Sequence, residues 1–203
     1  MILLLIVAAV LVVFGAVAVG IYNRLVQFRE NARSSFAQID VQLERRHDLI
    51  PNLVATASGY LNHERETLEA VISARASATQ LRVEVNGEPS NIEAMQKLTT
   101  SETNLGGALG RLMATAEAYP DLKANQQMQT LTEELRTTEN RISFARQNYN
   151  GQVRVYQNYK KSFPPILFAG LLGFQDDAYL DLDTEDKADK REVVQVDFDQ
   201  DAA

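Results

Sequence analysis

Apolar residues fill the start of the chain without interruption and then recur at helical spacing. Residues 1–22 carry no charged side chain, and the first one is Arg24. About 20 apolar residues at a rise of roughly 1.5 Å each match a bilayer hydrocarbon core of about 30 Å. The pattern therefore predicts a transmembrane helix over residues 1–22 that is held in membrane lipid.

A cleaved signal peptide is the alternative interpretation of this segment. The small residues at 16–18 would then serve as its cleavage site. However, no Lys or Arg precedes the apolar core, and the core is longer than that of a usual signal peptide. These two features favour an uncleaved anchor.

The charges that flank the span predict its orientation. Arg24, Arg29 and Arg33 follow it closely, and Glu30 is the one acidic residue among them. Basic residues beside a span tend to stay in the cytoplasm. We therefore expect an outside N-terminus and a cytoplasmic domain that begins at residue 23.

Beyond the span, apolar positions step alternately by three and four residues. The series is Tyr22, Leu25, Arg29, Ala32, Phe36, Ile39, Leu43, Arg46, Ile50, Leu53, Ala57 and Tyr60. A period of about 3.5 residues sustained this long predicts a long helix packed in a bundle or coiled coil. Pro51 interrupts the backbone hydrogen bonds but not the register, which favours one kinked, continuous helix. A restart capped by Asp48 or Asn52 is the alternative.

Turn residues divide the rest of the domain. Residues 83–89 contain Asn-Gly and a proline, and the spacing from Ser90 to Glu93 is that of a capping box. Pro120 ends one apolar-striped helix and starts the next, which continues to Phe163. We therefore predict an all-α fold, in which a transmembrane helix precedes an elongated antiparallel up-and-down bundle of three to four long helices over residues 23–174.

Two segments close the chain. Residues 166–174 are apolar but too short to span a membrane. We expect them to fold back onto the bundle, with insertion into the membrane surface as the alternative. Residues 175–203 are acidic and poor in core residues, which predicts a disordered tail. Within it, residues 193–198 alternate apolar and polar, a pattern suited to docking on a partner.

Charge and composition exclude several classes of protein. The net charge is −7, and the acidic tail accounts for it, because the rest of the chain is nearly neutral. A nucleic-acid-binding face of clustered basic residues is therefore not expected. The chain has no cysteine and two histidines, so we expect neither disulfides nor a dedicated metal centre.

The polar residues near the apolar seam give few candidates for chemistry. Glu44-x-x-His47, with Asp40 one turn earlier and Asp48 beside it, has the spacing of half a carboxylate metal site, but a second such motif is missing. No phosphate-binding loop or catalytic motif occurs, so we expect no catalytic residue, cofactor or small-molecule substrate. For Arg46 the structural hypothesis is a buried ion pair with Glu139 that fixes helix register.

Several stretches of the sequence resemble the LemA family. They are residues 39–54, 59–60, 63–64, 74–76, 119–125, 138–142, 145–146, 149–150, 163–164 and 173–174. The resemblance covers roughly residues 22–174. One departure is the run Ala55-Thr56-Ala57-Ser58, where members often carry a charged residue, so a charged contact is expected to be missing there.

The resemblance implies a single-pass protein of the bacterial inner membrane with a helical cytoplasmic domain and no established activity. Similar proteins are associated with magnetosome membranes and with genes for membrane proteases, which suggests a scaffold or adaptor that self-associates or binds a membrane protein. A metal-dependent enzyme or a protease regulator is the alternative. The signature residues expected to act in structure or interaction are Asp40, Arg45, Arg46, Asp48, Pro51, Asn52, Glu64, Arg75, Pro120, Glu139, Asn140, Arg141, Tyr149 and Asn150.

Overall fold

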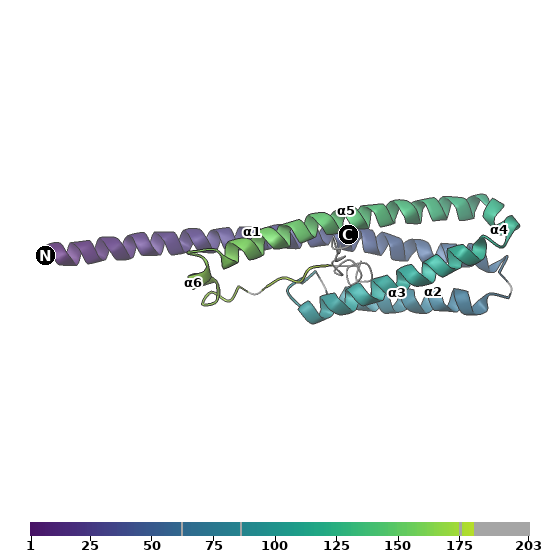
Figure 1. Cartoon of the computed structure of the whole chain (residues 1–203), viewed down its shortest axis with the longest axis horizontal. Helices are drawn as coiled ribbons and strands as arrows, with labels where there is room; N and C mark the ends of the chain where they lie inside the picture. The colour runs from purple at the N-terminus through teal and green to yellow at the C-terminus, as the bar shows by residue number, and fades with distance from the viewer. Residues whose placement is uncertain (62, 86, 175, 181–203) are drawn as a thin grey trace, which may run out of the picture.

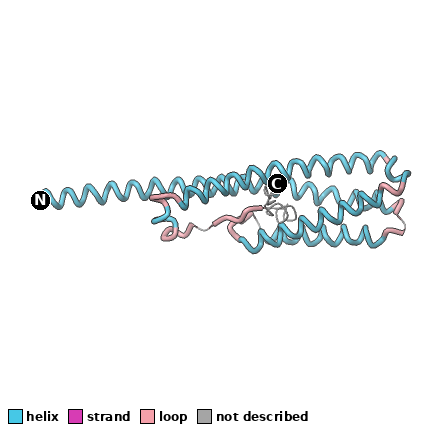
Figure 2. The backbone as a smooth tube through the Cα atoms, in the orientation of Figure 1, coloured by secondary structure: helices cyan, strands magenta, loops and turns pink. Residues whose placement is uncertain are grey.

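Four long helices run alternately up and down in an elongated bundle (Figure 1). The computed structural model describes residues 1–61, 63–85, 87–174 and 176–180, and in these ranges it contains helices, turns and no strand (Figure 2). The helices are α1 (Ile2–Ser58), α2 (Arg65–Val85), α3 (Ile92–Ala116), α4 (Pro120–Ala124), α5 (Gln126–Lys161) and α6 (Ile166–Ala169). The predicted all-α architecture is confirmed, with four long helices.

Helix α1 runs from the apolar N-terminal segment into the bundle without a break. Residues 2–20 of this helix are exposed apart from the partly buried Ala18, and from Ile21 onward its apolar stripe is buried. The expectation that the helix continues across Pro51 is confirmed, which removes the restart capped by Asp48 or Asn52. The predicted apolar series extends to Tyr60. Helix α1 stops before that residue, at Ser58, and the chain then turns back into α2.

The side chain of Arg75 compensates for Pro51. A proline at position 51 has no N–H to donate to the carbonyl of His47, four residues earlier. Arg75 in α2 donates from Nε to that same His47 oxygen at 2.7 Å. Pro51 itself is exposed and Ile50 and Leu53 stay buried, so the helix keeps its packing. The carbonyl of His47 that the proline leaves free links α1 to α2 through Arg75.

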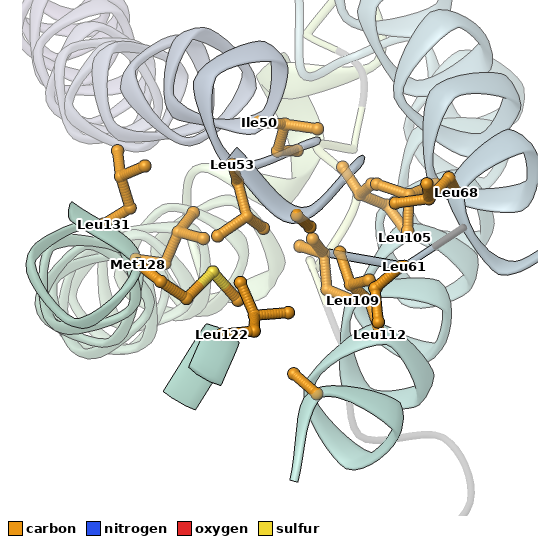
Figure 3. Close-up of a cluster of buried hydrophobic side chains, with 14 of the residues drawn as sticks. Ile50, Leu53, Leu61, Leu68, Leu105, Leu109, Leu112, Leu122, Met128 and Leu131 are labelled. Atoms are coloured by element: carbon orange, nitrogen blue, oxygen red, sulfur yellow. The ribbon is translucent and has the colours of Figure 1, made fainter. Parts of the chain in front are cut away.

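Three apolar cores follow one another along the bundle. The distal core surrounds Leu53 and contains Leu105, Leu112, Leu122 and Met128 (Figure 3). The middle core is built around Phe36, Met95, Leu98 and Tyr149. The proximal core, next to the exposed segment of α1, consists of Ile21, Leu25, Tyr156, Ala169 and Phe174. Residues of α1 belong to all three.

Two helix starts differ from those the sequence predicts. Helix α3 is capped by Asn91, whose side chain accepts from the N–H of Ala94 at 3.1 Å, and not by Ser90. Pro120 opens the short helix α4, as its fixed φ favours, but the last long helix starts only after Asn125. That residue is extended, and its side chain accepts from the N–H of Met128 at 3.0 Å.

The packed part of the chain extends beyond residue 174. Asp177 and Leu180 are buried, and Ala178 donates its N–H to the carbonyl of Pro89 at 3.1 Å. Tyr149 and Asn150 of α5 hold the same segment by hydrogen bonds to its backbone. The predicted disorder is therefore wrong for residues 176–180, because hydrogen bonds to the backbone and the buried side chains of Ala178 and Leu180 dock this acidic segment. Residues 181–203, including the alternating run at 193–198, lie outside the described residues.

Replacing Arg75 tests its role as the partner of the freed carbonyl. We expect Arg75→Leu to lower the free energy of unfolding by about 1–3 kcal/mol, since it leaves the His47 carbonyl without its charged donor. In a Pro51→Ala background the cost is smaller, because the introduced alanine supplies the missing N–H. Denaturant unfolding of the full chain in detergent micelles, followed by circular dichroism, measures both values. Equal costs in the two backgrounds would contradict the compensation.

Arg65→Leu is the matched control for this experiment. Arg65 lies on the same helix and pairs with Glu69 at 2.7 Å, and both side chains are largely exposed. Its replacement is expected to change the free energy of unfolding by less than about 0.5 kcal/mol.

Candidate functional site: a buried polar layer and its pocket

A layer of polar side chains separates the distal core from the middle core. Arg46 and His47 of α1 and Glu102 of α3 are each less than 5 % exposed. The imidazole Nε2 of His47 lies 2.8 Å from Glu102 Oε1, and Arg46 Nη1 lies 3.6 Å from Glu102 Oε2. Buried charges in such a place are retained only with partners, because desolvation of an unpaired ion costs several kcal/mol.

Both ring nitrogens and the carbonyl oxygen of His47 have hydrogen-bond partners on other helices. Its Nδ1 lies 3.2 Å from the hydroxyl oxygen of Thr79 in α2, its Nε2 faces Glu102, and the carbonyl of the same residue accepts from Arg75. Because both ring nitrogens have protein partners, the imidazole has no free position for a substrate or a metal. The partners of His47 lie on α2 and α3, so this residue links α1 to both helices.

A glycine makes room for the guanidinium of Arg46. A side chain at Gly106 of α3 would place its Cβ 3.4 Å from Arg46 Nη2, so any residue larger than alanine would compete with the arginine for space. An alanine would still fit at this distance, so the approach limits the size of residue 106 without requiring a glycine.

The layer opens to solvent through a pocket of about 380 Å³. Glu139 of α5 stands at its mouth and is about half exposed, and its Oε2 lies 3.0 Å from Arg46 Nη1. The hypothesised pair of Arg46 and Glu139 is therefore present, but only its arginine is buried. The pocket is lined by Arg46, Glu102, Thr103, Gly106, Glu139, Asn140, Ile142, Ser143 and Arg146.

The four residues of the metal hypothesis point to different places. Arg82 of α2 holds both Asp40, at 3.0 Å, and Glu44, at 3.6 Å. His47 is turned into the polar layer, and Asp48 is exposed. Across the part of the chain that the structure describes, no three His, Asp or Glu side chains are grouped to hold a metal ion. The arrangement therefore gives this hypothesis no support.

Comparison with known proteins identifies the family. The LemA family model matches residues 35–198. This chain belongs to the LemA family. Among its relatives is the magnetosome protein MamQ of Magnetospirillum gryphiswaldense, 28 % identical over 174 residues, which cover 76 % of this chain and 62 % of MamQ. Protein LemA of Metamycoplasma hominis is 25 % identical over 138 residues, 68 % of this chain and 58 % of that protein. The chain thus spans about three-fifths of the length of these relatives.

The LemA signature residues are distributed along the bundle and do not form one site. Arg46, Glu139 and Asn140 meet at the polar pocket, and Tyr149 and Asn150 hold residues 178–180. At the distal end, the carboxylate of Glu64 accepts from the Tyr119 hydroxyl at 3.3 Å, next to Pro120. The signature residues exposed on α1 are Arg45, Asp48, Pro51 and Asn52.

Sequence reasoning missed Glu102 and Arg82. Glu102 had a signal, because Met95, Leu98, Leu105 and Leu109 place it on an apolar stripe at the spacing that Arg46 occupies in α1. Two seam positions with opposite charges on different helices are candidates for a buried pair. Arg82 had no such signal, since a basic residue near the end of a helix is ordinary.

Burial changes the ionisation of the segment that follows α6. Desolvation raises the pKa of Asp177, although Arg29, Arg33 and Lys160 oppose the effect with their positive charges. Desolvation, and to a lesser extent the charge of Asp177, also raise the pKa of Tyr156 to about 12 and that of Tyr149 still further. The carboxylate oxygen Oδ2 of Asp177 has no hydrogen-bond partner among the described residues.

A double-mutant cycle tests whether Arg46 pairs more strongly with Glu102 or with Glu139. We expect Arg46→Met to cost about 3–5 kcal/mol, because it leaves Glu102 buried without its cation. The coupling of Arg46 with Glu102, measured with Glu102→Gln, should exceed its coupling with the half-exposed Glu139, measured with Glu139→Gln. The latter is expected to be about 1 kcal/mol or less. Larger coupling to Glu139 would contradict the buried layer.

Asp177→Asn is expected to stabilise the protein at neutral pH. The pKa of Asp177 is higher in the folded than in the unfolded state, so its ionisation weakens folding as pH rises through that interval. The melting temperature of the variant should exceed that of the wild type by about 2 °C or more at pH 7. The difference should vanish as pH falls to about 4, the ordinary pKa of aspartate. A gain that does not depend on pH would point to a cause other than ionisation.

Proposed function

We propose that this chain is a single-pass membrane protein whose helical bundle serves as a rigid scaffold or adaptor rather than as an enzyme. The observation that carries the proposal is the continuity of α1, which is both the apolar N-terminal segment and a member of all three cores. Ile2–Ser58 is long and apolar enough to cross a membrane. At 57 residues it measures roughly 85 Å.

Such a helix fixes the bundle to its anchor without a flexible linker. The side chain of Ile21 is already buried in the proximal core, and the ring of Tyr22 lies 5.7 Å from that of Phe174. A bundle attached in this way projects from the membrane as one body. This property suits a protein that holds partners at a defined distance from the lipid.

The names of the relatives do not contradict a structural role. MamQ is named for a magnetosome and Protein LemA for the family, so neither name states a reaction. The apolar helix and these relatives mark the chain as membrane-associated. The basic residues that follow the span, Arg24, Arg29 and Arg33, favour a bundle in the cytoplasm of a bacterial cell.

One groove on the bundle has the composition of a protein-binding surface. It lies between α1 and α5, has a volume of about 720 Å³, and its lining includes the exposed apolar residues Val41 and Phe144. Asn140 and Arg141 of the signature also line it, and Phe144 is 75 % exposed. An exposed aromatic residue with a polar surround is typical of binding hot spots. We propose that a helix of a protein partner packs in this groove.

The competing proposal is a metal-dependent enzyme or a protease regulator that uses Asp40, Glu44, His47 and Asp48. It has less support, because Arg82 and Glu102 already engage three of these residues. Metal analysis of the purified full chain separates the two proposals. Stoichiometric metal that is lost in His47→Gln would favour the enzyme.

A photo-crosslinking residue at position 144 tests the adaptor proposal. Introduced in place of Phe144 in the full chain in its native membrane, it should give discrete crosslinks to protein, and the mass of each product distinguishes a second copy from another partner. Ile72 of α2 is the matched control position, since it is also an exposed apolar residue but lies outside the groove. Equal products from both positions, or none from position 144, would contradict a partner in the groove.

A further inference from the structure

An uncharged loop extends from the end of the bundle beside the apolar segment of α1. We call residues 162–174 the apolar foot. No charged residue occurs between Lys161 and Asp176, and Lys160 Nζ lies 2.5 Å from Asp176 Oδ1. An ion pair thus joins the two ends of the foot where they meet the bundle.

The outer surface of the foot is apolar. Phe163 and Leu171 are 80 % and 87 % exposed, and Ile166 and Leu167 are more than half exposed. The inner residues Ala169 and Phe174 are buried in the proximal core. The expected folding back of this segment is therefore seen, but it leaves several large apolar side chains of one short segment exposed, as at an interaction site.

The foot packs on the segment of α1 predicted to lie in lipid (Figure 1). The ring centroids of Phe168 and Phe14 are 5.5 Å apart. Phe14 precedes Arg24, the first charged residue, by ten positions, or roughly 15 Å along the helix. A groove of about 500 Å³ between the two elements is lined by Ala9, Val10, Val13, Phe14, Val17, Phe163, Pro164, Leu167 and Phe168, all of them apolar.

Basic and aromatic side chains gather at one level along the long axis of the molecule, where α5 ends beside α1. The guanidinium of Arg24 lies 5.7 Å from the ring centroid of Tyr159 in α5, and Lys160 and Lys161 end that helix. Such residues gather where a membrane meets water. The foot and the apolar segment of α1 extend from this level in the same direction, so a bilayer that contains one also meets the other.

Most of the foot's backbone N–H groups are absent or paired, as a medium without water requires. Irregular backbone in hydrocarbon is unfavourable because its N–H groups lack partners. Pro164 and Pro165 have no N–H, and seven of the nine amides of residues 166–174 bond to carbonyl groups within residues 162–170. Those with such bonds are Ile166, Leu167, Phe168, Ala169, Leu172, Gly173 and Phe174.

We propose that the apolar foot is embedded in the bundle-side leaflet beside the span, where lipid acyl chains cover its outer surface. This inference rests on the membrane span of the proposed function but not on a protein partner. A bundle held by both a span and a foot has two attachments to the bilayer. The pair of attachments limits the tilt of the bundle relative to the membrane.

Tryptophan reporters test the proposal directly, because the chain contains no Trp. Leu171→Trp in the full chain is reconstituted in vesicles of phosphatidylcholine and phosphatidylglycerol, with or without brominated acyl chains. We expect blue-shifted emission that brominated lipid quenches and aqueous acrylamide does not. Ile72→Trp, at an exposed position on the bundle outside the groove of Phe144, should show the opposite behaviour. Val12→Trp, at an exposed position of the span, reports on the anchor alone.

The possible outcomes separate the two proposals. Quenching of the reporter at position 171 by acrylamide alone, with the reporter at position 12 quenched by brominated lipid, would overturn the embedded foot and leave the anchor intact. Failure of brominated lipid to quench either position would overturn the anchor as well. Blue-shifted emission from position 171 that brominated lipid does not quench would show that protein covers the foot, and this also overturns the proposal.

Discussion

The apolar stripe of α1 is the constraint on which the rest of the structure depends. The stripe repeats about every 3.5 residues, and each core takes residues from it: Leu25 in the proximal core, Phe36 in the middle core and Leu53 in the distal core. In each core, residues of the other helices pack against this stripe. A break in α1 would therefore separate the cores and also detach the bundle from the apolar N-terminal segment.

Two polar features interrupt the stripe, and both are matched by other helices. Arg46 and His47 are joined by Glu102, and the carbonyl freed by Pro51 is taken by Arg75. Apolar cores tolerate sliding by one heptad, whereas a buried charge has only one position where its partner is found. The polar layer thus defines the register of α1 against α2 and α3. Charged residues of the LemA signature, such as Arg46, Glu139 and Arg75, thus take part in contacts between helices.

The sequence predicted the elements of the fold better than the contacts between them. Periodicity located the long helices and carried α1 correctly through Pro51, since a proline on the exposed face leaves Ile50 and Leu53 in place. The pair of Arg46 with Glu139 was found in the same way, from polar residues near a seam. Glu102 was missed because a single sequence does not show which residue on another helix faces a given seam position. Residues 176–180 were misjudged because their composition is acidic, while Tyr149 and Asn150 recognise their backbone.

The hydrogen bond from Ala178 to Pro89 has a consequence for the order of assembly. Pro89 lies in the connection between α2 and α3, so the last described segment of the chain closes a junction that was synthesised about ninety residues earlier. Domains begin to fold as they leave the ribosome, the N-terminal part first. In a nascent chain that ends before residue 178, the end of the α2–α3 hairpin at Pro89 therefore lacks this hydrogen bond. The bond forms only after the segment that carries Ala178 has left the ribosome.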